Sequence, residues 1–154
     1  MKAEFMNPFL QATQDVFKQM LSLDIERGKT QLKEDLIEGK EVNVLIGVVG
    51  SLVGVVTFSF SKSMALEMVK SMAGMEVTEL NIFVTSALGE IGNIISGNAI
   101  SYLAKANYIC DIAPPQIILS ENKSISLSTT KSLFVLIKTN LGDFTINIAL
   151  KENH

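Results

Sequence analysis

Residues Val42–Phe60 have the sequence VNVLIGVVGSLVGVVTFSF and contain no charged side chain. A run of this length and apolarity is long enough to cross a membrane as a helix. Three glycines interrupt it, however, and its second half alternates Thr57 and Ser59 with phenylalanines, which is the period of a strand. Gly50-Ser51 at its centre predicts a two-residue hairpin turn. We therefore predict two buried strands here and expect no association with a membrane.

Composition narrows the class of protein further. The chain has 154 residues, 47% of them hydrophobic, and a formal net charge of −3. This hydrophobic content excludes intrinsic disorder, and the length is typical of one domain, so we predict a single domain over residues 1–154. Lysine and arginine are scattered and aromatic residues are few, which argues against a nucleic-acid partner. The acidic balance argues against binding to an anionic membrane surface.

Cysteine and histidine are almost absent. Cys110 is the only cysteine, and His154, the last residue, is the only histidine. The chain can therefore form no intramolecular disulfide, and we expect neither a metal site nor a Ser–His or Cys–His catalytic pair within the fold. The first residues carry charges and no apolar core, so no signal peptide is predicted and a cytoplasmic location is expected.

Three helices are predicted outside the hairpin. The first, Asn7–Leu23, is amphipathic, with its first residue as N-cap and Pro8 at the first helical position, where the missing N–H costs little. The second, Lys62–Ala73, is short and ends at Gly74, a residue suited to a C-terminal cap. The third and longest covers about Thr78–Ala106.

The remaining strands favour an α+β fold. They are Thr30–Ile37, Tyr108–Ile112, Gln116–Leu119, Ser124–Ser128 after a turn at Glu121–Lys123, and a closing hairpin of Leu133–Lys138 and Phe144–Leu150. The sequence of the first hairpin, over Leu45–Phe60, resembles that of the last, over Leu136–Ile148. We predict a single α+β domain with a mostly antiparallel sheet, helices packed on one face, and an internal pseudo-twofold repeat.

The long helix has one apolar face and one small, polar face. At about 100° per residue an apolar stripe is predicted to face the core, and its members are Val84, Leu88, Ile91, Ile95, Ala99 and Tyr102. The opposite face carries Ser86, Glu90, Asn93, Gly97 and Ser101. An ordinary exposed helix face would carry lysine, arginine, glutamate and glutamine. Glu90, by contrast, is the only charge between Glu79 and Lys105.

Glycines add to this unusual composition. Gly89, Gly92 and Gly97 each cost about 1 kcal/mol of helix stability relative to alanine. A helix that bears this cost and avoids bulk on its outer face is suited to close approach by another macromolecule. Local rules broken without a benefit to folding are expected at functional sites. We therefore predict that Ser86, Gly89 and Gly97 contact a partner.

Glu90 and Asn93 are three residues apart, so their side chains emerge side by side from the helix. A carboxylate can pair with a cation of a partner, and a carboxamide can hold a water through its donor and its acceptor. Hydrolysis of a reactive acyl phosphate needs little more than a positioned water and charge stabilisation. The alternative interpretation is a solvated helix face, with Ser86 bonded to a preceding carbonyl, because a Glu-x-x-Asn pattern also arises by chance.

The pattern Ser86-x3-Glu90-x2-Asn93, with Pro114-Pro115 some twenty residues later, resembles the motif of the CheX/CheC/FliY family of response-regulator phosphatases. The length, both hairpins and the short methionine-rich helix also resemble this family. The resemblance implies that Asn93 positions a water for in-line attack on the aspartyl phosphate of a CheY-type response regulator. It further implies that Glu90 pairs with a lysine of the regulator and that Ser86 lies at the edge of the contact.

The resemblance carries further expectations for chemotaxis and two-component signalling. The Mg²⁺ of the reaction would belong to the response regulator, so the phosphatase would need no cofactor of its own. Some family members carry the motif twice, but the first helix offers only Gln11, Asp15 and Lys18 in register, with no acid-x-x-Asn. We therefore expect a single active face. A homodimer paired through sheet edges is implied as well, and exposed strand edges are compatible with it.

Two other classes of function remain open from the sequence. A non-catalytic adaptor or flagellar-switch module would keep the binding face but would have no need of the Asn93 carboxamide. A membrane-associated protein built on Val42–Phe60 would require detergent for solubility. The methionines at helical spacing allow two interpretations, an adaptable recognition surface or filling of the core. They are Met64, Met68, Met72 and Met75.

Overall fold

The computed structural model describes residues 2–33, 36–120, 126–128 and 131–154. The turn predicted at Glu121–Lys123 and the first two residues of the strand predicted at Ser124–Ser128 lie outside these ranges. Within them the helices are α1 (Ala3–Leu21), α2 (Lys62–Ala73) and α3 (Ile82–Lys105). The strands are β1 (Glu26–Lys33), β2 (Leu36–Glu38), β3 (Val42–Gly50), β4 (Leu52–Phe60), β5 (Cys110–Ile112), β6 (Gln116–Leu119), β7 (Ser126–Ser128), β8 (Ser132–Thr139) and β9 (Gly142–Glu152).

A seven-stranded antiparallel sheet organises the part of the chain that the structure describes. Its order is β1-β8-β9-β4-β3, and β5 and β6 pair with opposite ends of β3. A separate two-stranded sheet joins β2 to β7. The predicted α+β class with a mostly antiparallel sheet is therefore confirmed, whereas the internal repeat stays a prediction.

The uncharged stretch forms the hairpin of β3 and β4, as predicted. Val42, Val44 and Ile46 are fully buried because one face of β3 packs under the helices. No helix among the described residues is long and apolar enough to cross a membrane. The register pairs Val48 with Gly54, which centres the connection on Ser51. The predicted two-residue turn is therefore wrong, since such a turn would have paired the residues on either side of Gly50-Ser51.

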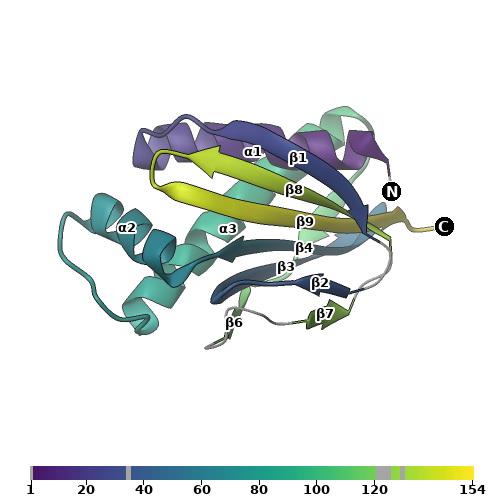
Figure 1. The fold of residues 1–154 in the computed structure, drawn as a ribbon. Helices are drawn as coiled ribbons and strands as arrows, with labels where there is room; N and C mark the ends of the chain where they lie inside the picture. The colour runs from purple at the N-terminus through teal and green to yellow at the C-terminus, as the bar shows by residue number, and fades with distance from the viewer. Residues whose placement is uncertain (1, 34–35, 121–125, 129–130) are drawn as a thin grey trace.

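Helices cover one face of the sheet, as predicted. In Figure 1, α1 and α3 lie side by side behind the sheet, and α2 lies near one end of α3. The rings of Phe17 on α1 and Phe60 on β4 both stack on Phe144 of β9, with ring centroids 5.0 and 4.9 Å apart. These aromatic contacts join the helical layer to the middle of the sheet.

The first helix begins four residues earlier than predicted. Its N-cap is Lys2, which makes no capping hydrogen bond through its side chain, and Pro8 lies inside the helix. The earlier start is explained by contacts of the first turns with the rest of the fold. Phe5 and Met6 are only 2% exposed, and the Phe5 ring meets the Tyr108 ring edge-on at 5.2 Å. Burial of two large side chains offsets the backbone hydrogen bond that a proline removes.

The other two helices follow their local signals. The Ser61 hydroxyl accepts a hydrogen bond from the Met64 N–H at 3.1 Å, and Gly74 ends α2 with a positive φ of 69°. Both bounds of α2 agree with the prediction. The third helix begins after Asn81, whose side chain caps the Val84 N–H at 3.0 Å, rather than at Thr78.

Two of the four methionines singled out from the sequence fill the core, and a recognition role for the other two stays a prediction. Met64 and Met68 are buried in the core, at 1% and 0% exposure, so core filling is correct for them. Met72 packs against the core while partly exposed, and Met75, just beyond the helix, is 55% exposed.

Asn43 is a fully buried polar residue on the side of β3 that faces away from the core helices. Its Oδ1 accepts hydrogen bonds from the Lys40 N–H at 3.0 Å and the Ser59 hydroxyl at 2.7 Å. Its Nδ2 donates to the Lys40 carbonyl at 2.8 Å and, at 3.1 Å, to the carbonyl of Ile118 in β6. One carboxamide thereby holds the entry to β3, strand β4 and strand β6 together.

Replacement of Asn43 by alanine is expected to lower the free energy of unfolding by about 3 kcal/mol, because several buried polar groups lose their partner at once. Urea denaturation measures the loss. Ser59→Ala is the matched control, since it removes one donor and leaves Asn43 its other bonds, so a loss of about 1 kcal/mol or less is expected. Equal effects of the two substitutions would contradict this assignment.

Candidate functional site

The polar face predicted for the long helix is present on α3. Ser86 and Glu90 are exposed, while Asn93 and Gly97 are half-buried. Ser101 is exposed and its hydroxyl donates to the Gly97 carbonyl at 3.3 Å. These positions form a strip along the outer side of the helix, which we call the α3 face.

Opposite the α3 face, the predicted apolar stripe packs into the core. Val84, Leu88, Ile91, Ile95 and Ala99 are all at most 1% exposed. Tyr102, the last predicted member, is only partly buried, and its hydroxyl donates a hydrogen bond to the Asp15 carboxylate of α1. That bond, with burial, raises the pKa of the Tyr102 phenol. The stripe thus fixes which side of α3 faces solvent.

The three glycines of α3 serve different purposes. A Cβ on Gly92 would lie 2.8 Å from Val44 Cγ1 in β3, so this glycine allows the helix backbone to approach the sheet. Gly89 is buried, and a Cβ there would meet Pro115 and Ile117, each at 3.5 Å. Gly89 is thus largely covered by its neighbours, and its contact with a partner stays a prediction. A Cβ on Gly97 would meet nothing within 4 Å.

Pro115 lies against the turn of α3 that leads into Glu90. Of the Pro114-Pro115 pair, it is Pro115 whose Cγ and Cβ atoms a side chain at position 89 would meet, at 3.5 and 3.7 Å from an added Cβ. The segment that carries it is held by strand β6, which pairs with β3. The serine, glutamate, asparagine and proline of the sequence pattern therefore lie in one region of the fold, and the proline supports the helix from below.

The side chains of Glu90 and Asn93 remain available for binding within the part of the chain that the structure describes. Neither side chain makes a hydrogen bond or an ion pair there. Polar side chains that are partly buried usually find a partner inside the protein. A half-buried carboxamide without one is available to bind a water or a group supplied by another molecule.

Phe83 belongs to the same face and was missed from the sequence. It lies two turns before Glu90 and is 46% exposed. The signal was present, because a spacing of seven residues returns a helix to nearly the same direction. Only polar and small residues were predicted on the outer face, so this aromatic residue was left out.

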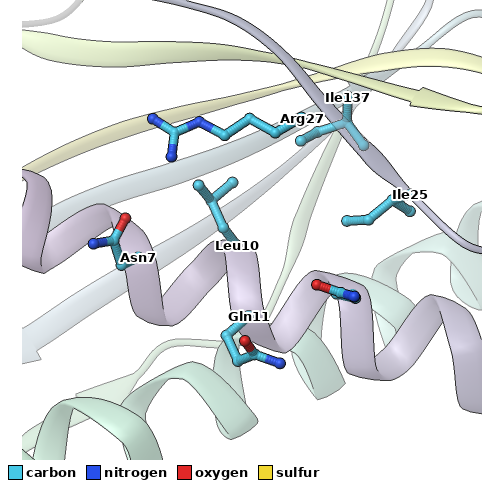
Figure 2. A pocket seen from close by; sticks show the side chains of 7 residues that line it. Asn7, Leu10, Gln11, Ile25, Arg27 and Ile137 are labelled. Atoms are coloured by element: carbon cyan, nitrogen blue, oxygen red, sulfur yellow. The ribbon is translucent and has the colours of Figure 1, made fainter.

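A groove between α1 and the sheet is a second candidate site (Figure 2). It has a volume of about 280 Å³, and its lining residues are Asn7, Leu10, Gln11, Gln14, Ile25, Arg27 and Ile137. The guanidinium of Arg27 is bound to the Thr30 hydroxyl through Nε and Nη2, at 3.2 and 3.1 Å. The lining offers carboxamides and one cation but no carboxylate, thiol or hydroxyl, so it lacks an acid, a base and a nucleophile.

Glu90 and Asn93 therefore lie on the α3 face and outside this groove. Such a placement suits insertion into the site of a partner protein better than capture of a small molecule, which favours concave pockets. Among the described residues no group of three or more His, Cys, Asp or Glu side chains could hold a metal ion.

Comparison with known proteins gives a consistent result. The model of the family described as "Chemotaxis phosphatase CheX" matches residues 42–138. A curated relative, the CheY-P phosphatase CheX of Thermotoga maritima, is 26% identical in an alignment 158 positions long that covers 99% of each chain.

Solved structures resemble this fold over nearly its whole length. A CheC-like superfamily protein from a Shewanella species superposes with a TM-score of 0.87 at 30% identity, covering 98% of this chain and 99% of that one. The CheX of a CheX–CheY–BeF3–Mg²⁺ complex from Borrelia burgdorferi superposes with a TM-score of 0.80 at 32% identity, covering 96% and 98%.

Alanine substitutions at Gly92 and Gly97 are expected to change stability in opposite directions. Gly97→Ala should raise the free energy of unfolding by up to about 1 kcal/mol, because helix propensity improves and the new methyl group meets open space. Gly92→Ala should lower it by ~1 kcal/mol or more, because the stiff, buried Val44 side chain has to move. Thermal and urea unfolding measure both variants. A stabilised Gly92→Ala variant would show that the helix is seated less tightly than described.

Proposed function

This chain belongs to the family of chemotaxis phosphatases described as CheX, and we propose that it removes the phosphoryl group from a phosphorylated CheY-type response regulator. The observation that carries the proposal is the pair of Glu90 and Asn93, adjacent on the exposed side of α3 and without a partner inside the described chain. The Thermotoga relative is named as a CheY-P phosphatase, and the Borrelia relative forms a complex with CheY, which supports the assignment.

Asn93 is proposed as the catalytic residue. Its half-buried position limits the orientations of the side chain, and its amide offers one acceptor and two donor hydrogens. Inserted beside the aspartyl phosphate, it would orient a water for in-line attack on phosphorus. The new bond joins the water oxygen to phosphorus, the bond from phosphorus to the aspartate oxygen breaks, and inorganic phosphate leaves. Positioning of this kind supplies much of the rate in phosphoryl transfer.

The neighbouring residues of the α3 face are proposed to hold the partner. Glu90 would pair with a lysine of the regulator, and an ion pair desolvated in an interface contributes more than an exposed one. Ser86 would lie at the edge of the contact, and Gly97 would leave clearance for the partner backbone. The Mg²⁺ of the reaction would reside in the regulator.

Further features of the proposed function rest on the family. We propose a cytoplasmic protein that forms a homodimer through a sheet edge. Strand β1 lies at one edge of the sheet and carries Leu32, which is 55% exposed. An edge strand with an exposed apolar side chain is suited to pairing with a second copy.

The test is the decay of a phosphorylated CheY-type receiver from the same organism. The wild-type protein should accelerate decay, and Asn93→Ala should reduce the acceleration by about 10²-fold at unchanged stability. Glu90→Ala should raise KM by roughly tenfold or more, because the regulator lysine loses its partner.

Asn98→Ala is the matched control, since Asn98 is also half-buried on α3 but points away from the α3 face. It should behave as wild type. Acceleration that survives Asn93→Ala would remove the catalytic role from that residue. Binding of the receiver without any acceleration would favour the adaptor function instead.

A further inference from the structure

Phe83 stands apart from the other apolar residues of α3. It is 46% exposed and belongs neither to the buried core nor to the partly buried residues that pack against it. Within the described chain its ring makes no aromatic or cation contact. Ala87 and Ile94, which share its side of the helix, do pack against the core. The fold therefore makes little use of the phenyl group.

The direction of Phe83 is set by the helix. At about 100° per residue, its side chain points within about 20° of Glu90 and lies about 10 Å away along the axis. Ser86, the residue between them on this face, is too small to shield the ring. Ile82 is more exposed, at 83%, and points within about 20° of Asn93, but it points about 80° away from Glu90 and lies about 16 Å from Asn93 along the axis. A partner that engages Glu90 and Asn93 would thus extend over Phe83.

Selectivity for one response regulator over another needs a contact outside the shared reaction centre, such as one made by the exposed Phe83 side chain. The contacts proposed for Glu90 and Asn93 involve the aspartyl phosphate and a lysine, which belong to the reaction and are common to any receiver that serves as substrate. Such contacts cannot distinguish one receiver from another, because specificity is a difference between affinities. Ser86, Gly97 and Ser101 offer little surface. Aromatic side chains, by contrast, often dominate interface energetics when a partner encloses them.

We infer that Phe83 is a specificity-determining contact, seated against an apolar surface patch of the response regulator about 15 Å from its phosphorylation site. This inference rests on the proposed function. The partner is defined by its chemistry: a phosphorylated receiver domain whose surface beside the acidic site is apolar at this distance. A receiver with a charged or polar group there would be a poorer substrate.

Steady-state hydrolysis of two different phosphorylated receivers from the same organism tests the inference. Phe83→Ala should raise KM for the preferred receiver by about tenfold with kcat nearly unchanged, because the lost contact contributes equally to the bound ground state and the transition state. The ratio of kcat/KM between the two receivers should fall toward one. Phe83→Leu should restore part of the preference. Ile109→Ala should behave as wild type, because Ile109 is an exposed apolar residue beyond the opposite end of α3.

The controls separate this inference from the proposed function. If the wild type hydrolyses receivers in an Asn93-dependent way and Phe83→Ala leaves KM and the receiver preference unchanged, the inference is wrong and the phosphatase stands. If the wild type binds receivers without hydrolysing them, the same variants are compared by Kd, with the same expectations. If it neither binds nor hydrolyses any receiver, both proposals fail. Thermal unfolding should show equal stability of Phe83→Ala and Ile109→Ala.

Discussion

The close approach of α3 to β3 is the constraint on which the rest of this structure depends. It is possible because Gly92 carries no side chain where Val44 rises from the sheet. With the helix seated at this depth, Leu88, Ile91 and Ile95 reach the core. The opposite side of α3 is then left exposed at Ser86, Glu90 and Ser101 and half-buried at Asn93 and Gly97. The position of Glu90 and Asn93 is thus a consequence of packing on the other side of the same helix.

The support of the site extends into the non-helical part of the fold. Pro115 and Ile117 contact Gly89 from the β6 segment. That segment is fastened to β3 by strand pairing and by the bond from the Asn43 amide to the Ile118 carbonyl. Residues far apart in sequence therefore fix one turn of α3. The two carboxamides therefore differ in what they can bind. The buried carboxamide of Asn43 is saturated with hydrogen bonds inside the protein. The carboxamide of Asn93 has none within the described chain.

Sequence alone predicted the elements whose signals are local. The bounds of α2 follow from Ser61 and Gly74, and the strands of the central hairpin follow from alternation and valine content. The start of α1 could not be predicted in this way, because Phe5 is buried by Tyr108, about a hundred residues later. For the site, the helical wheel placed Glu90 and Asn93 correctly on the outer side. The wheel also separates Gly92, which is four residues from Leu88 on the buried side, from Gly97 on the outer side. It could not predict the burial of Gly89, which depends on Pro115 and Ile117 from a distant part of the sequence.

The packing of α3 against the sheet also affects the entropy that is lost when a partner binds. A recognition element that is disordered before binding loses conformational entropy when it docks, and its affinity is reduced accordingly. Here the backbone that presents Glu90 is already immobilised by the sheet below it and by Pro115 beside it. Only side-chain rotamers remain to be ordered. The protein would therefore meet its partner as a rigid template, and any adjustment of backbone shape during docking would fall to the other molecule.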